Sequence, residues 1–307
     1  MVNVPAFQDF SLPLPVARAI LHPFFRFTMH PRVPWRVQRT LLDAGSVLQQ
    51  SPPGTRRQRL RLGGRPAERI TGDRPAVDAG AVLYLHGGGY TIGSPATHRS
   101  LAAHLARDLR RPVYLPDYRL APEHPYPAAL DDAEAAFLEL LGTGLAPENL
   151  VVAGDSAGGG LALALAERLR DVHGIGPAAL GLIAPWSDPN EKPGRPRDLV
   201  INSAWSHAAA EAYRGGGNGL DPGYAPLLGR LDGLPPCYVQ VDAGELLYGQ
   251  CTRLVAGLRA AGVPVQFSVT RGLWHVAQLQ AALVAPAAAE LRAMSDFLGR
   301  ALEPAAA

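Results

Sequence analysis

Ser156 is the residue whose surroundings most directly predict chemistry. It is the central residue of Gly154-Asp155-Ser156-Ala157-Gly158, which matches the pattern Gly-x-Ser-x-Gly. An apolar run at 150–153 precedes the motif and an Ala/Leu-rich helical stretch at 157–171 follows it. This context predicts a sharp strand-to-helix turn that exposes the serine hydroxyl, with a helix start that favours developing negative charge. A phosphate-binding loop would need Gly-Lys-Ser/Thr, but the only lysine is Lys192, so we predict a nucleophilic serine rather than that loop or a plain glycine-rich turn.

A second glycine motif, His86-Gly87-Gly88-Gly89, directly follows the apolar run 81–85. Consecutive glycines let the backbone approach a substrate and direct its N–H groups toward one point. The N–H groups of Gly88, Gly89 and Ala157 are predicted to bind a tetrahedral oxyanion, where the loss of one donor costs about 2.7–4 kcal/mol. His86 and Gly87 are predicted to support this loop, His86 by hydrogen bonding rather than as a base.

A nucleophilic serine needs a general base, and three histidines follow Ser156 in the chain: His173, His207 and His275. His173 ends the predicted helix after Ser156, and His207 lies in an irregular stretch. His275 comes just after a predicted strand at 265–270, at the carboxyl edge of the sheet where open α/β sheets form their active sites. We therefore predict His275 as the base.

The acid that orients the histidine has two candidates, Asp242 and Glu245, which follow the apolar run 237–241. Either carboxylate could accept a hydrogen bond from the imidazole and stabilise the imidazolium. Glu245 lies three residues further out, but its longer side chain adds reach. Spacing alone does not distinguish them.

The elements that must position these residues alternate between strand and helix. Period-2 alternation predicts a strand at 58–62, and short apolar runs predict others; between them lie amphipathic or Ala/Leu-rich helices. The strands are predicted at 58–62, 81–86, 113–116, 150–155, 179–184, 237–242 and 265–270, and the helices at 97–110, 127–141, 157–171, 249–261 and 286–300. This rhythm predicts a parallel sheet covered by helices on both faces. Seven arginines between Arg56 and Arg74 are interpreted as polar positions of edge strands rather than a binding patch.

Two segments depart from this rhythm. In the first segment, residues 13–50, the apolar pattern predicts two helices, one at 16–29 interrupted at Pro23 and one at 35–49. The second, 187–235, is rich in proline and glycine and predicts one helix at 203–213. A long insertion of this kind is typical of an active-site lid or binding loop.

Composition narrows the class of protein. The 307 residues are 47% hydrophobic and 18% charged, with a net charge of +2, which excludes a disordered chain and argues against nucleic acid or an anionic membrane as the main partner. We find no run of 18 uncharged apolar residues and no signal-peptide pattern, so we expect no membrane-spanning helix and a cytoplasmic protein. Cys237 and Cys251 are expected to be buried thiols; their spacing does not fit a metal site, and we expect no metal or cofactor.

Taken together, the motifs resemble those of the hormone-sensitive-lipase-like group of α/β-hydrolases, the bacterial family IV carboxylesterases. The resemblance extends from about residue 13 to residue 300. It rests on the stretches His86–Tyr90 (HGGGY), Asp117–Ala129 (DYRLAPEHPYPAA), Gly154–Gly159 (GDSAGG), Ala184–Asp188 (APWSD) and Gly272–Val276 (GLWHV).

The resemblance implies an α/β-hydrolase fold, with a mostly parallel eight-stranded sheet flanked by helices and covered by a helical cap. It implies N-terminal cap helices at 1–52, a first part of the core at 53–187, a cap insertion at 188–225 and a second part of the core at 226–307. The family's acid motif, laid on 241–247, favours Glu245 over Asp242. Asp242 stands where the family usually has glycine, and Gly249-Gln250 replaces an expected acidic pair.

The implied activity is that of a serine carboxylesterase acting on short- to medium-chain acyl esters, a small-molecule substrate class. Alternatives with the same triad are a lactonase, an amidase or a natural-product deacetylase; a non-catalytic binding protein and an interfacial lipase are further ones. The family also suggests a homodimer through about 264–300. Aromatic candidates for the acyl pocket are Phe24, Phe25, Phe27, Trp35, Trp186, Trp205 and Tyr213.

Overall fold

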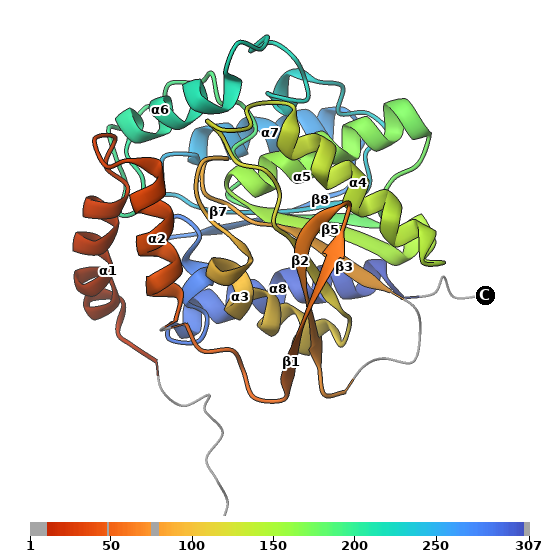
Figure 1. Ribbon diagram of the computed structural model, residues 1–307, viewed down its shortest axis with the longest axis horizontal. Coiled ribbons are helices and arrows are strands. Elements are labelled where there is room, and N and C mark those ends of the chain that lie inside the picture. Colours follow the sequence, from red (N-terminus) through yellow and green to blue (C-terminus); the bar gives the residue numbers. More distant parts are fainter. Residues whose placement is uncertain (1–10, 48, 75–79, 304–307) are drawn as a thin grey trace, which may run out of the picture.

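A single eight-stranded, mostly parallel sheet forms the centre of the molecule (Figure 1). The computed structural model describes residues 11–47, 49–74 and 80–303. The strand order is β1-β2-β4-β3-β5-β6-β7-β8, and every neighbouring pair from β4 to β8 is parallel. This is the mostly parallel, eight-stranded α/β-hydrolase sheet that the family resemblance implies.

The central strands are apolar because helices cover both of their faces. β3 (Ala81–Leu85), β5 (Leu150–Asp155), β6 (Ala179–Ile183) and β7 (Cys237–Asp242) are buried at every position. A strand buried on both sides has no polar face, which explains the continuous apolar runs in the sequence. β4 (Val113–Pro116) lies next to β3, and β8 (Val265–Thr270) forms the far edge of the sheet.

The first two strands form an antiparallel hairpin, β1 (Thr55–Leu62) with β2 (Arg65–Gly72). The sequence predicts only the first of them as a separate strand. β2 lies inside the sheet between β1 and β4, so the arginine-rich region is not entirely at an edge. Charged residues interrupt the apolar pattern of β2, so the sequence does not predict it as a strand. One of them, Glu68, is buried because both of its oxygens accept hydrogen bonds from Arg99, at 2.7 and 2.8 Å.

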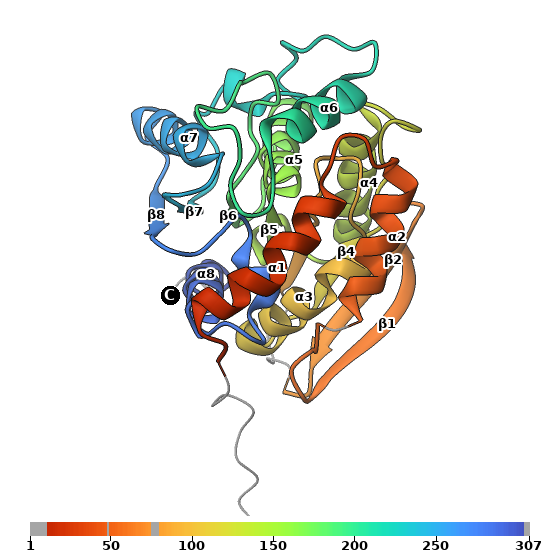
Figure 2. The ribbon, with the colours of Figure 1, turned by 90° about the vertical axis from the view of Figure 1, so that its left-hand side faces the viewer.

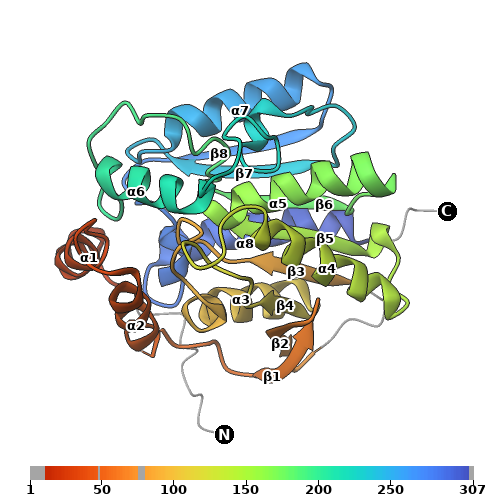
Figure 3. The ribbon, with the colours of Figure 1, turned by 45° about the horizontal axis from the view of Figure 1, so that its top comes forward.

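Helices cover the sheet in two layers (Figures 1 and 3). α3 (Pro95–Leu109) and α8 (Ala285–Ala301) pack on one face, whereas α4 (Ala128–Gly142), α5 (Ala157–Arg168) and α7 (Tyr248–Ala260) pack on the other. A π-helical turn at Leu169–His173 follows α5, and short 3-10 turns lie at Pro147–Asn149, Pro226–Leu228 and Ala277–Gln280.

Three further helices lie together on one side of the molecule: α1 (Leu14–Thr28), α2 (Trp35–Ser46) and α6 (Ser203–Arg214) (Figure 2). The predicted interruption at Pro23 is wrong, because α1 runs through it. Pro23 and Ala19 are both exposed, so the carbonyl that loses its donor lies on the solvent side of the helix. α2 ends three residues before the predicted Gln49.

Two other expectations can be compared with the structure. Cys237 and Cys251 are buried free thiols, as predicted. Among the described residues, every helix is too short or too polar to cross a membrane. The homodimer and the cytoplasmic location stay predictions.

Candidate active site

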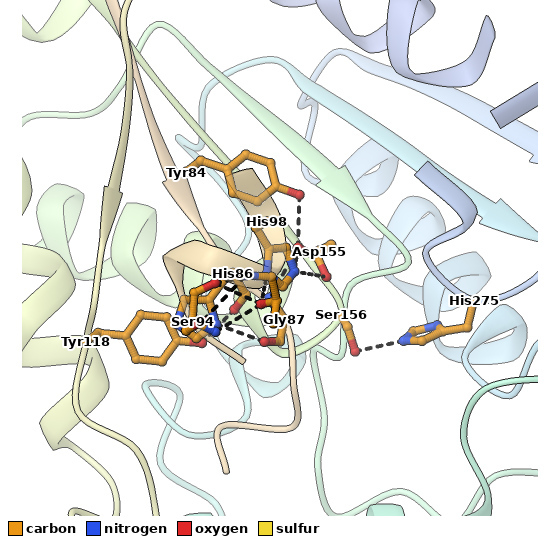
Figure 4. Close-up of polar contacts among 10 residues, drawn as sticks. Tyr84, His86, Gly87, Ser94, His98, Tyr118, Asp155, Ser156 and His275 are labelled. Carbon is orange, nitrogen blue, oxygen red and sulfur yellow. Dashed lines mark hydrogen bonds and ion pairs between the residues drawn. The ribbon is translucent and has the colours of Figure 1, made fainter. Parts of the chain in front are cut away.

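The structure brings Ser156, His275 and Glu245 into one hydrogen-bonded line. His275 Nε2 lies 2.8 Å from Ser156 Oγ, and His275 Nδ1 lies 2.5 Å from Glu245 Oε2. All three side chains are buried, and Figure 4 shows the serine and the imidazole facing each other. The three residues come from different elements: Ser156 joins β5 to α5, Glu245 follows β7, and His275 follows β8. The imidazole can therefore accept a proton from the hydroxyl while the carboxylate holds its other nitrogen.

The turn that carries Ser156 requires glycine on both sides. Ser156 has φ 51° and ψ −121°, a conformation that non-glycine residues rarely adopt. A Cβ at Gly154 would lie 2.3 Å from the carbonyl oxygen of Gly158, and one at Gly158 would lie 2.0 Å from that of Leu85. The neighbouring backbone thus leaves no room for a side chain, and the strained serine is held where β5 meets α5.

Glu245, and not Asp242, contacts the imidazole. Oε1 of Glu245 accepts a hydrogen bond from the backbone N–H of Asp242 at 2.6 Å, which leaves Oε2 for His275. The Asp242 carboxylate instead accepts from Gly244 N–H, from the Thr270 hydroxyl and from Leu273 N–H, at 2.8 to 2.9 Å. It therefore joins the acid-bearing loop to the loop that carries His275.

Glu245 also raises the pKa of His275. Burial alone would lower the pKa of His275, but the hydrogen bond to Glu245 and the negative charge of that carboxylate raise the pKa above its usual value. Asp198 and Asp155 add to the negative charge near the ring and act in the same direction. The site thus stabilises the protonated, imidazolium form of His275.

Hydrogen bonds fix the orientation of three backbone N–H groups next to Ser156. In a trans peptide the C=O and the following N–H point in opposite directions, so fixing one fixes the other. Thr91 N–H and Ile92 N–H donate to the carbonyl of Gly88, which orients the N–H of Gly89. Gly160 N–H and Trp186 N–H donate to the carbonyl of Ser156, which orients the N–H of Ala157.

The third N–H, that of Gly88, is oriented by His86. Nδ1 of His86 donates to the carbonyl of Gly87 at 2.9 Å, and this carbonyl belongs to the same peptide unit as the Gly88 N–H. Burial lowers the pKa of His86 to about 3, so the ring is neutral. It stacks on Tyr118 at 4.2 Å between centroids, and the Tyr118 hydroxyl donates to the His86 carbonyl at 2.6 Å. Within the described chain, the N–H groups of Gly88, Gly89 and Ala157 have no protein acceptor.

A buried polar cluster that no sequence motif predicts lies next to this loop (Figure 4). The Asp155 carboxylate accepts from the Tyr84 hydroxyl at 2.9 Å and from Gly87 N–H at 3.1 Å, and it lies 3.1 Å from His98 Nε2. Asp155 is part of the serine motif, but no spacing rule relates it to a tyrosine on β3 or a histidine on α3. The cluster ties Gly87 to the turn that bears Ser156.

A largely apolar cavity of about 340 Å³ opens at Ser156. Gly87, Gly88, Gly89 and His275 line it, together with residues of α1, α2, α3, α6 and the segments 200–201 and 276–283. Of the predicted aromatic residues, Phe24, Phe25 and Trp205 line it. Trp35 packs edge-on against Trp205, Tyr213 stacks on Tyr90, and Trp186 is buried near Tyr90. Phe27, another of the candidates, does not line the cavity and is 64% exposed.

Each segment above the cavity also holds one of the loops of the site by a charged side chain. Arg18 on α1 donates to the carbonyl of Leu273 at 3.0 Å, two residues before His275. Arg39 on α2 donates to the carbonyl of Thr91 at 2.8 Å. In the insertion, Asp198 accepts from Leu246 N–H at 3.0 Å, next to Glu245.

The only described cluster of possible metal ligands belongs to the same site. Ligand atoms of Asp198, Glu245 and His275 lie within 4.8 Å of one another. Both ring nitrogens of His275 are already engaged, one by Glu245 and one by Ser156. The arrangement therefore fits proton transfer better than metal binding.

Comparison with known proteins identifies relatives across most of the chain. A family model described as an alpha/beta hydrolase fold matches residues 82–279. The chain is 39% identical to an acetyl-hydrolase of Streptomyces hygroscopicus, over 66% of this chain and 70% of that one. It is 35% identical to the esterase LipU of Mycobacterium tuberculosis, over 87% and 94% of the two chains.

Solved structures agree with these relatives. The crystal structure of an esterase from the bacterial hormone-sensitive lipase family superposes with a TM-score of 0.88. It is 33% identical in sequence and covers 93% of this chain and 98% of its own.

Proposed function

The chain belongs to the hormone-sensitive-lipase-like, bacterial family IV esterases of the α/β-hydrolase fold and is a carboxylic ester hydrolase, and we propose that it acts through a Ser156-His275-Glu245 triad on short- to medium-chain acyl esters. In this proposal Gly88, Gly89 and Ala157 form the oxyanion hole, and His86 and Gly87 support it. The helices of residues 1–52 and the insertion 188–225 form a cap over the pocket.

The first step is attack of Ser156 Oγ on the ester carbonyl carbon. As the new C–O bond forms, the hydroxyl proton moves to Nε2 of His275, and the carbonyl electron pair moves onto oxygen. The Glu245 carboxylate stabilises the imidazolium at Nδ1. The N–H groups of Gly88, Gly89 and Ala157 donate to the oxyanion, which is the charge that develops in this step.

The second step breaks the bond to the leaving alcohol. The oxyanion re-forms the carbonyl, the alkoxide leaves, and His275 returns the proton to it, so that an alcohol departs and the acyl group stays on Ser156. Water then attacks the acyl-enzyme with His275 as base, and the same steps release the carboxylic acid and restore the serine hydroxyl.

The observation that carries this proposal is the continuous line from Ser156 Oγ through both imidazole nitrogens to Glu245 Oε2, at 2.8 and 2.5 Å. A binding protein on this fold has no use for a serine in a strained turn whose hydroxyl contacts an imidazole with a raised pKa. The geometry therefore supports catalysis.

The size and lining of the cavity support the substrate class. About 340 Å³ is near the lower end of the volumes that ligand pockets occupy. Its walls are apolar, with few polar groups such as Gln49 and Gln280. Such a pocket accommodates a short acyl chain and its alcohol but encloses a long chain poorly, in keeping with a relative named as an acetyl-hydrolase.

The test is the initial rate of hydrolysis of p-nitrophenyl acetate, butyrate, octanoate and palmitate by the wild type and by Ser156→Ala. We expect turnover of the shorter esters by the wild type, a lower rate with palmitate, and a loss of at least about 10³-fold in kcat for the variant. Ser203→Ala, at a serine outside the triad, is the matched control. Retained turnover by a folded Ser156→Ala protein would exclude this nucleophile. A folded wild type that is inactive on all four esters would point to a narrow natural-product hydrolase or a binding protein.

A further inference from the structure

α1 has a feature that the proposed triad does not require: it is apolar on two sides. Its inner side packs on the molecule through residues such as Ala17, Phe25 and Thr28, which are buried. A second apolar stripe, spaced i, i+4, i+7 and i+11, consists of Val16, Ile20, Pro23 and Phe27. This stripe faces solvent: Val16, Ile20 and Phe27 are 44, 59 and 64% exposed. A helix that only covers a pocket needs the inner side alone.

A third side of the same helix is basic. Arg18, His22 and Arg26 follow one another at intervals of four residues and are exposed. Arg32 and Arg36 extend this charge into the connection to α2 and its first turn. The segment from residue 11 to residue 42 contains no aspartate or glutamate. Within the described structure, none of Arg18, Arg26, Arg32 and Arg36 has an ion pair, in contrast to Arg39, which pairs with Glu123.

The exposed stripe adjoins the opening of the cavity. Ile20 belongs to the stripe and also lines the cavity, as does Leu283, and both are exposed, at 59 and 39%, so the cavity reaches the surface beside them. The two segments are joined, because Leu12 N–H donates to the carbonyl of Leu283 at 2.8 Å. In Figure 2, α1 crosses the side of the molecule that faces the viewer, with no element in front of it.

From this combination we propose that the outer face of α1 docks the enzyme on a lipid surface with anionic headgroups, with the mouth of the pocket facing that surface. Helices that lie in a membrane interface have an apolar side that enters the boundary region and a basic side that contacts the headgroups. The apolar stripe and the adjacent arginines meet both requirements, and the absence of acidic residues removes repulsion from the headgroups. A second copy of this chain would present the same positive charge to itself, which disfavours a self-complementary contact through this face.

Docking here would bring substrates dissolved in the lipid to the pocket. An ester with an apolar chain partitions into the boundary region, where the opening between Ile20 and Leu283 would receive it directly. The proposal goes beyond the esterase activity and does not depend on which residues form the triad.

The experiment is co-sedimentation of the full chain with vesicles of phosphatidylcholine alone or of phosphatidylcholine mixed with phosphatidylglycerol. We expect binding to the anionic vesicles that is weakened by salt. The double variant Val16→Ser/Phe27→Ser should lower the partition coefficient about tenfold, since neither side chain lines the cavity and both are exposed. Its rate on p-nitrophenyl acetate in solution should match that of the wild type, which verifies that the site is intact.

Two matched controls distinguish binding through this face from nonspecific binding through exposed apolar or charged residues elsewhere on the surface. Val172→Ser/Leu220→Ser removes two side chains that are 67 and 72% exposed elsewhere and should leave binding unchanged. Arg26→Glu/Arg32→Glu should abolish the preference for anionic vesicles, whereas Arg56→Glu/Arg59→Glu, the same charge change on exposed positions of β1, should reduce it by less than about threefold.

Three results would overturn the proposal. The first is a wild type that does not bind the anionic vesicles. The second is equal binding by the wild type and Val16→Ser/Phe27→Ser. The third is a dimer in light scattering that this double variant converts to a monomer, because the stripe would then be covered by a second copy of the chain.

Discussion

At the scale of single residues, the carboxylates of Asp242, at the end of β7, and Glu245, just after it, have separate tasks although they lie only three positions apart. Glu245 contacts the imidazole, and Asp242 holds Thr270 and Leu273, the residues that lead to His275. The sequence alone could not divide these tasks, because both side chains lie at the same end of one strand. What decides is the turn after β7, in which the Asp242 N–H itself donates to Glu245.

We predict that Glu245→Gln and Asp242→Asn differ in severity. Glu245→Gln removes the negative charge at Nδ1 and should lower kcat by about 10²- to 10⁴-fold. Because Glu245 raises the pKa of His275, and the proposed mechanism needs a neutral His275, the acid limb of kcat/KM should move to lower pH in this variant. Asp242→Asn keeps an acceptor oxygen and should lower kcat by about tenfold, with the acid limb displaced less.

Steady-state rates on p-nitrophenyl butyrate across the pH range measure both effects. The assignment fails if Asp242→Asn is the more damaging change and Glu245→Gln keeps the activity and pH profile of the wild type.

At the scale of elements, the segments over the cavity do more than enclose it. Asp198 illustrates this: Oδ1 accepts from Val200 N–H and Ile201 N–H, both at 2.8 Å, and Oδ2 accepts from Leu246 N–H. Val200 and Ile201 line the cavity, and Leu246 follows Glu245. One carboxylate thus joins the wall of the pocket to the loop that bears the acid.

We therefore predict that Asp198→Ala lowers kcat by about 10- to 100-fold by releasing the Glu245 loop, since small displacements of catalytic groups have effects of this size. The variant also removes a charge that raises the pKa of His275, so the acid limb of kcat/KM should move to lower pH. Asp232→Ala, at an exposed aspartate paired with Arg230, is the control. A kcat within about twofold of the wild type, with an unchanged pH profile, would rule out this positioning role.

Most of the element order was predictable, and the exceptions have physical reasons. Apolar runs in the sequence predict the buried strands, and the motifs at 86–89 and 154–158 predict two loops of the site. β2 was not assigned, because its charged residues break the apolar pattern; Glu68 is buried all the same, since Arg99 pairs with it. His98 and Tyr84 were not found, because their meeting at Asp155 is a tertiary contact between β3, α3 and the serine turn.

At the scale of the whole molecule, one buried carboxyl makes folding depend on pH. Glu167 on α5 is 4% exposed, and neither of its oxygens has a hydrogen-bond partner in the described structure. Burial raises its pKa to about 9. The folded state therefore binds a proton that the unfolded state releases above about pH 4.5, so this group's contribution to stability falls as pH rises from about 4.5 toward 9.

Glu167→Gln should remove this penalty. We expect the melting temperature of the variant to exceed that of the wild type at pH 8 and the difference to shrink at pH 5, with a change in the free energy of unfolding of up to about 1.4 kcal/mol per pH unit. Calorimetry at both pH values measures this, with Glu148→Gln, at an exposed position, as the control. The account of Glu167 is wrong if the difference between variant and wild type is the same at both pH values.

The measurement that tests the central claim most directly is mass spectrometry of the protein after reaction with diethyl p-nitrophenyl phosphate, which phosphorylates activated serines. Attack by Ser156 Oγ expels p-nitrophenolate and leaves a stable phosphoester. The account predicts one adduct per chain, located by peptide mapping on Ser156, and none in Ser156→Ala. An unmodified wild-type chain, or an adduct on another residue, would contradict it.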